Sequence, residues 1–123
     1  MYGTLKKWHQ EFGDSIEILL YPSDEFGNQE LPSKQVAPFV ESKGLPTNGG
    51  GCTLMEKTKV NGPDADPLWK RVKDQYPGDV GWNFDGIFLF DARGRPMGRY
   101  SAGELNAVGK RLVQLVNLAK QEL

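Results

Sequence analysis

The sequence contains little cysteine and histidine and no long apolar run. Cys52 and His9 are the only residues of their kinds among the 123. A single cysteine excludes an intrachain disulfide and favours a reducing compartment. No apolar run reaches the roughly 20 residues that a bilayer span needs, and Met1–Thr4 has neither the basic nor the apolar region of a secretory signal. These absences favour a cytoplasmic protein without stable membrane insertion.

The charge balance shows no excess of either sign. The chain has 15 basic and 16 acidic residues and a formal net charge of −1, so neither nucleic acid nor an anionic membrane is indicated as a partner. A hydrophobic content of 38% and a charged content of 25% are ordinary for a globular protein. The length is sufficient for one domain with a single core.

The spacing of apolar residues predicts alternating helices and strands. A short amphipathic helix over 5–12 ends at Gly13, and a strand over 15–21 follows. Asp66 and Pro67 are typical of a helix start, and Ser101 with Glu104 forms a capping box. The remaining predicted elements are a helix over 33–44, the helix that starts at 67 and ends near 76, a hairpin of strands 87–90 and 97–100, and a final helix over 101–119. Residues 45–51 are predicted to form no element, and 52–60 an irregular or edge-like stretch.

A polar loop follows the first predicted strand. Ile16–Leu20 shows almost no polar alternation, which is typical of a parallel strand buried on both faces. Ligands on such sheets bind beyond the carboxyl ends of the strands, where Gln29 lies in the loop Tyr21–Glu30. An ordinary surface loop would give the same pattern, so this loop alone does not identify a site.

A second polar segment, Gly81–Phe84, precedes the predicted hairpin. It is accompanied by further short motifs: Phe26–Glu30, Lys59–Gly62, Asp66–Leu68 and Arg99–Tyr100. Taken together, in order and spacing, these segments resemble the glutathione peroxidase family. The resemblance covers essentially the whole chain. It implies an α/β, thioredoxin-like fold of the glutathione peroxidase type, with residues 1–123 forming a single domain.

The resemblance also implies that Gln29, Trp82 and Asn83 form the catalytic donor set. A peroxidatic thiolate or selenolate must be anionic, and two amides and an indole can donate hydrogen bonds to it while staying neutral. The implied activity is reduction of hydrogen peroxide or organic and lipid hydroperoxides in the response to oxidative stress. Glutathione or another thiol would be the co-substrate, and no bound cofactor or metal is expected. Without the family pattern, Trp82 would be expected in the core and Asn83 in a turn.

The nucleophile that this donor set would serve is absent from the 123 residues. In the family it lies just before the position of Met1, so we expect a chain that is truncated at its N-terminus and lacks the first strand or strands of the sheet and any targeting segment. A selenocysteine codon taken for a stop would place a start at Met1. Cys52 is expected to be a small buried hydrophobe, and His9 a solvated helical residue.

Departures from the family pattern leave the reductant and the peroxide open. Ser23–Glu25 replaces the Cys-Asn-Gln of the family, and no resolving cysteine lies near Val40. The short link between the 67–76 helix and Trp82 lacks the insertion that builds tetramers, which favours a monomer. Four basic residues are expected near the opening of the active site: Lys70, Arg71, Arg93 and Arg95. They could attract the carboxylates of glutathione or lipid headgroups, or they could be solvated surface charges. We expect solvated charges. The alternative function is a redox-inactive, thioredoxin-fold binding domain.

The expected truncation has a consequence for folding. The missing strand would lie between the strands over 15–21 and 87–90, and each unpaired buried backbone group costs about 1–3 kcal/mol against a total stability of about 5–15 kcal/mol. We predict that the 123-residue chain alone aggregates or stays partly unfolded and that an added N-terminal strand rescues it. A cooperative thermal transition of a soluble 123-residue monomer would contradict this prediction.

Overall fold

The computed structural model describes residues 1–23, 25, 33–81 and 84–121. The chain divides into two compact units, Met1–Lys59 and Val60–Leu123. Each unit has its own secondary structure and its own buried residues, and each is described on its own. The single domain over 1–123 stays a prediction.

The first unit contains two helices and a small sheet. Helix α1 ends as predicted, because the backbone N–H of Gly13, at φ 53°, donates to the carbonyl of His9. A single 3-10 turn, Gly13–Ser15, then leads into the sheet. The elements of this unit are α1 (Tyr2–Phe12), β1 (Ile18–Leu20), α2 (Ser33–Ser42), β2 (Asn48–Gly49) and β3 (Cys52–Leu54).

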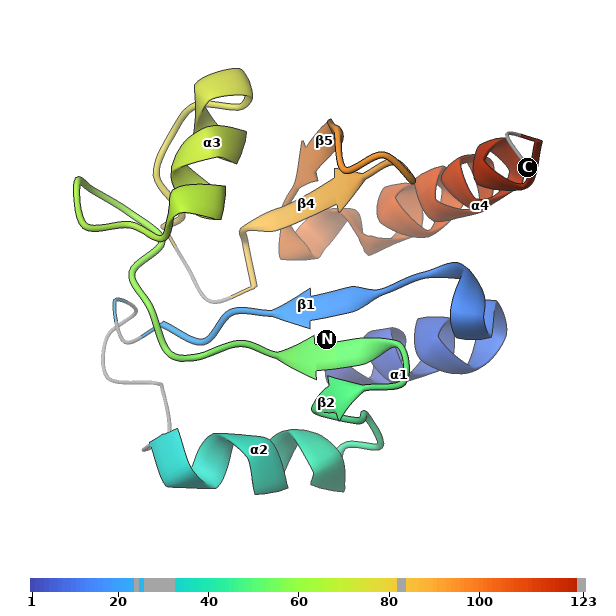
Figure 1. The fold of residues 1–123 in the computed structure, drawn as a ribbon, viewed down its shortest axis with the longest axis horizontal. Helices are drawn as coiled ribbons and strands as arrows, with labels where there is room; N and C mark the ends of the chain where they lie inside the picture. Colours follow the sequence, from blue (N-terminus) through green and yellow to red (C-terminus); the bar gives the residue numbers. More distant parts are fainter. Residues whose placement is uncertain (24, 26–32, 82–83, 122–123) are drawn as a thin grey trace. The chain divides into compact units, whose positions relative to one another are not determined.

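The sheet of the first unit has the order β1-β3-β2 (Figure 1). Strand β1 is parallel to β3, with Ile18 opposite Cys52, and β2 is antiparallel to β3. The prediction of a parallel strand is therefore confirmed. The prediction that β1 is buried on both faces is wrong, because Leu19 is 46% exposed.

Two strands of this sheet were not predicted from the sequence. Residues 45–51 were expected to form no element, yet Asn48–Gly49 is β2. The stretch over 52–60 was expected to be irregular or edge-like, yet it begins with β3, the middle strand of the sheet. Gly49, Gly50 and Gly51 all have positive φ, which reverses the chain between the two strands. Strands of two and three residues are too short for an alternation of apolar and polar residues to appear.

The core of the first unit joins both helices to the sheet. Val36 and Val40 of α2 pack with Leu45 and Cys52. Partly buried residues of α1 and the strands surround this cluster: Tyr2, Leu5, Ile18, Leu20 and Leu54. The apolar stripe of each helix therefore faces the same small sheet.

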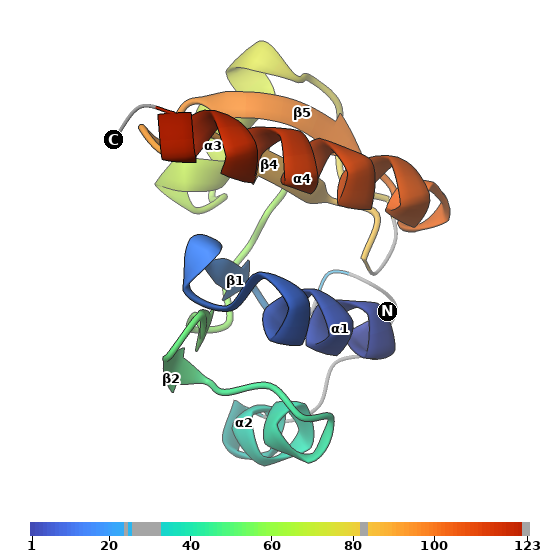
Figure 2. The same cartoon turned by 90° about the vertical axis from the view of Figure 1, so that its right-hand side faces the viewer.

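The second unit contains α3 (Pro67–Gln75), β4 (Ile87–Phe90), β5 (Pro96–Tyr100) and α4 (Leu105–Gln121). Both predicted helix starts are confirmed. The Asp66 side chain accepts a hydrogen bond from the Leu68 N–H at 2.9 Å, and the Ser101–Glu104 capping box precedes a 3-10 turn, Ala102–Glu104, that continues into α4. Helix α4 runs along the β4–β5 hairpin (Figure 2).

The hairpin turn is organised by one carboxylate. Asp91 accepts hydrogen bonds from the backbone N–H groups of Arg93 and Arg95, both at 2.9 Å, and from Arg95 Nε at 2.6 Å. The backbone N–H of Arg95, then its side chain and the N–H of Arg93, hold the pKa of Asp91 below its ordinary value of 3.8. The charged form of Asp91 is therefore favoured by folding.

This lowered pKa predicts an acid dependence of the hairpin. A carboxyl whose pKa is lower in the folded state stabilises that state above its unfolded pKa and loses the contribution as pH falls through the folded pKa. In the chain extended by an N-terminal strand, which we expect to fold, the wild-type sequence should lose more stability than Asp91→Asn between about pH 5 and pH 3, measured by urea unfolding, since Asn does not titrate. An NMR titration of Asp91 that gives a pKa above 3.8 would contradict the prediction.

Candidate functional site

All three predicted catalytic residues, Gln29, Trp82 and Asn83, lie outside the described residues. The structure does describe the backbone on both sides of Trp82–Asn83. That backbone belongs to the second unit, between the end of α3 and the start of β4. The geometry of the candidate site therefore has to be built from the residues that flank the pair.

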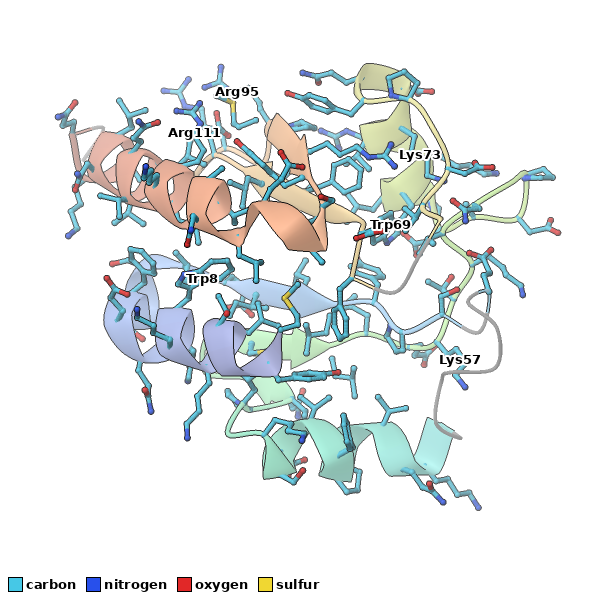
Figure 3. All side chains as sticks on the ribbon, turned by 180° about the vertical axis from the view of Figure 1, so that it is seen from behind. Trp8, Lys57, Trp69, Lys73, Arg95 and Arg111 are labelled. Atoms are coloured by element: carbon cyan, nitrogen blue, oxygen red, sulfur yellow. The ribbon has the colours of Figure 1, made fainter. Side chains whose placement is uncertain are left out.

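The two ends of the Trp82–Asn83 loop are packed against each other. A Cβ added at Gly86 would lie 2.8 Å from Val80 Cγ2 and 3.1 Å from Cζ3 of the Trp69 ring. Val80 itself is only 5% exposed. Figure 3 shows Trp69 projecting from α3. The chain therefore leaves Val80 and returns at Gly86 to the same place, where both residues pack beside Trp69 of α3.

The backbone directly after the pair is strained. Phe84 has φ 66°, and among the described residues it is the only non-glycine with positive φ. A left-handed backbone costs a residue with a side chain about 1–3 kcal/mol and persists only where neighbouring structure enforces it. The next residue, Asp85, accepts a hydrogen bond from the Ala102 N–H at 3.2 Å, which ties the loop to the start of the C-terminal helix.

The chain that enters the loop is held by one guanidinium. Arg99 of β5 lies over the Phe88 ring, with its Cζ 5.5 Å from the centroid. Its Nη1 donates to three successive carbonyls at 2.8–3.0 Å, and its Nη2 donates to a fourth at 3.1 Å: those of Tyr76, Pro77, Gly78 and Asp79. In the sequence, Arg99 is notable only as part of the family resemblance. No local sequence signal indicates that it binds a loop twenty residues away.

The only thiol of the chain is unsuited to peroxide chemistry. Cys52 is fully buried in the core of the first unit. Burial, and secondarily the negative charge of Glu17, raise the pKa of its thiol, which disfavours the reactive thiolate. The expectation that Cys52 is a small buried hydrophobe is confirmed.

The expectation that His9 is solvated is wrong for one of its ring nitrogens. Nδ1 is buried and has no hydrogen-bond partner within the described residues. The ring packs against Gly51, where an added Cβ would lie 3.1 Å from Nδ1. His9 follows the buried Trp8 in α1, and its side chain lies against the glycine turn between β2 and β3. Helical spacing alone did not reveal that contact.

The four basic residues named from the sequence are exposed, as expected: Lys70, Arg71, Arg93 and Arg95. Arg71 of α3 and Arg95 nevertheless come together, because both line an open hollow of about 520 Å³ between α3 and β5. Arg95 Nε is engaged by Asp91 at 2.6 Å. In the described part of the chain, no three His, Cys, Asp or Glu side chains are grouped to hold a metal ion, and no helix is long and apolar enough to span a membrane.

The close packing at the base of the loop gives a matched pair of glycine variants. The methyl group of Gly86→Ala would push the side chains of Val80 and Trp69 away from residue 86. This variant is expected to lower the free energy of unfolding by about 1–3 kcal/mol. Gly81→Ala, in the same loop, meets no described atom within 4 Å and is expected to be nearly neutral. Urea unfolding compares the two variants, each made in the chain extended by an N-terminal strand. Equal midpoints for both would show that the loop is not closed at Gly86.

Comparison with curated proteins finds glutathione peroxidases, although no protein-family model matches the chain. A glutathione peroxidase of Schistosoma mansoni is 36% identical over 106 residues, which cover 81% of this chain and 60% of that protein. A hydroperoxy fatty acid reductase of Synechocystis is 34% identical, covering 82% and 64%. A protein of Helianthus annuus named as a probable phospholipid hydroperoxide glutathione peroxidase is 31% identical over 124 residues, covering 96% and 67%.

Among solved structures, the crystal structure of Trgpx in apo form superposes with a TM-score of 0.67 at 25% identity, and the match covers 94% of this chain and 67% of the other. The predicted α/β, thioredoxin-like fold of the glutathione peroxidase type is confirmed by this likeness. The chain spans 60% and 64% of the Schistosoma and Synechocystis proteins. On its fold and on its identity to these relatives, the chain belongs to the glutathione peroxidase family.

Proposed function

We propose that this chain is part of a thiol-dependent peroxidase that reduces hydrogen peroxide or organic and lipid hydroperoxides in the response to oxidative stress. The observation that supports the proposal is the close packing of Val80 against Gly86, on the two sides of Trp82–Asn83, in a chain of this family. We further propose Gln29, Trp82 and Asn83 as neutral hydrogen-bond donors to the reacting sulfur or selenium. The packed ends of the segment that contains Trp82 and Asn83 support this role for those two residues, because donors must be positioned before the anion forms.

The proposed chemistry needs a nucleophile other than Cys52, because that thiol is buried and its pKa is raised. A thiolate or selenolate attacks one peroxide oxygen, the O–O bond breaks, and the other oxygen takes up a proton and leaves as water or alcohol. Two molecules of glutathione, or of another thiol, then reduce the oxidised nucleophile. They form one disulfide, and the bound oxygen leaves as water. The donors stabilise the anionic nucleophile before attack.

The names of two relatives support a lipid substrate class. One is a hydroperoxy fatty acid reductase and the other a probable phospholipid hydroperoxide glutathione peroxidase. We therefore propose fatty acid and phospholipid hydroperoxides as substrates alongside hydrogen peroxide. A monomer and a glutathione or other thiol co-substrate remain part of the proposal.

A second function is a redox-inactive binding domain of the same fold. The observation that favours it is the burial of the only thiol, since the 123 residues supply no reactive sulfur of their own. Such a domain would bind a partner or a thiol ligand without turnover.

Peroxidase assays on two proteins separate these functions. One is the 123-residue chain, and the other is the longest reading frame that contains it. Each is supplied with glutathione or thioredoxin and with hydrogen peroxide, a fatty acid hydroperoxide or a phospholipid hydroperoxide. We expect turnover by the longer protein only. A longer protein that is folded and inactive with every combination would refute the peroxidase and favour the binding domain.

Variants of the longer protein test the proposed donors. Asn83→Ala is expected to lower the second-order rate constant with hydroperoxide about 10- to 100-fold, because a hydrogen bond to a charged group contributes about 1.5–3 kcal/mol. Trp82→Phe, which removes only the indole N–H donor and part of the ring, is expected to act in the same direction. Asn106→Ala on the exposed side of α4 is the matched control and should leave the rate unchanged. Equal rates for Asn83→Ala and Asn106→Ala would exclude Asn83 from the site.

A further inference from the structure

One side chain pairs both backbone polar groups of Val80. Asn61 Nδ2 donates to the Val80 carbonyl at 2.8 Å, and Asn61 Oδ1 accepts from the Val80 N–H at 2.7 Å. An amide side chain presents a donor and an acceptor side by side, so it can replace the two backbone groups that a neighbouring strand would offer. Asn61 thus fixes the position and the orientation of the Val80 peptide groups across a sequence separation of 19 residues.

A lysine fixes the orientation of that amide. Lys73 lies on α3 (Figure 3). Its Nζ donates to Asn61 Oδ1 at 2.7 Å. The Lys73 side chain is only 14% exposed, and Asp79 Oδ1, on a side chain that is 80% exposed, lies 3.8 Å from Nζ. Because Oδ1 receives two donors, Val80 N–H and the Lys73 ammonium, a flipped amide would point its NH₂ group at both. The positive charge therefore selects the one orientation that pairs with Val80.

Val80 is the entry to the Trp82–Asn83 loop. Its side chain contacts the opposite end of the loop at Gly86, and the residues before it are held by Arg99. Of these contacts, the Asn61 pair is the one that acts on the peptide groups nearest to Trp82 within the described residues. A shift of Val80 would move the start of the loop directly.

We propose that Asn61 is a positioning residue for peroxide reduction and that Lys73 orients it. The inference rests on the proposed function and adds to it two residues that are joined to Val80 and to each other by the hydrogen bonds above. They act through Val80 on the loop that carries the proposed donors. The order of action is Lys73 on Asn61, Asn61 on Val80, and Val80 on the loop.

The test uses single and double variants of the longest reading frame that contains the chain. We expect Asn61→Ala to lower the second-order rate constant for oxidation by hydrogen peroxide about tenfold or more. A small displacement of catalytic groups lowers a reaction rate by that factor or by a larger one. Lys73→Met should lower it several-fold, and Lys73→Arg, which keeps the charge, should restore most of the loss. The double variant Asn61→Ala with Lys73→Met should be no slower than Asn61→Ala alone, since both act through the same contact.

Three further measurements separate positioning from stability. Hydrogen exchange of the Val80 amide should accelerate in Asn61→Ala, and urea unfolding should show that each variant is folded under the assay conditions. The rate of reduction of the oxidised enzyme by thiol should fall less than the rate of oxidation by peroxide. Asn117→Ala and Lys110→Met, on exposed positions of α4, are the matched controls and should keep both rates.

The outcomes distinguish this inference from the proposed function. A folded Asn61→Ala enzyme whose Val80 amide exchanges rapidly but whose rate with peroxide stays within twofold of wild type would overturn the inference and leave the peroxidase intact. If the loss of rate in the double variant equals the product of the losses in Asn61→Ala and Lys73→Met, the two residues act independently and the proposed role of Lys73 is overturned. A folded wild-type enzyme without any peroxidase activity would refute the proposed function, and the positioning role with it.

Discussion

The second unit depends on how the backbone at Val80 is satisfied. This residue is 5% exposed and lies in no strand, so its N–H and carbonyl would each carry the cost of a lost hydrogen bond if they were left without partners. Asn61 pairs both groups, and this allows Val80, a residue outside any strand, to be buried in the segment between α3 and β4. Val80, held in this way, is one of the two residues against which Gly86 packs.

Much of the fold could be predicted from local patterns. The S-x-x-E box at Ser101, the Asp66–Pro67 pair and the spacing of Val108, Leu115 and Val116 all act within one or two helical turns, and the helices they predicted are present. Strands β2 and β3 could not be predicted in the same way. A strand of two or three residues exists because a partner pairs with it, and pairing between Ile18 and Cys52 joins positions that are far apart in the sequence.

The residues of the candidate site also fall into those that the sequence could identify and those that it could not. Gln29, Trp82 and Asn83 were identified from a resemblance across the whole chain, which carries information on distant positions that no single motif holds. The residues that hold the loop could not be assigned roles in this way. Asn61 and Arg99 act across 19 and 20–23 residues, through hydrogen bonds to backbone atoms, and backbone atoms leave no trace in the identity of the residue that bears them.

The burial of Cys52 has a consequence for the selectivity of oxidation. A protein with the proposed activity would itself be exposed to hydroperoxides, and any accessible thiolate would compete for the oxidant and could be oxidised to sulfinic or sulfonic acid. With its side chain fully enclosed and its protonated form favoured, Cys52 is sheltered from that competition. The core of the first unit thereby keeps oxidising equivalents from being spent on the one sulfhydryl whose modification would damage the packing around it.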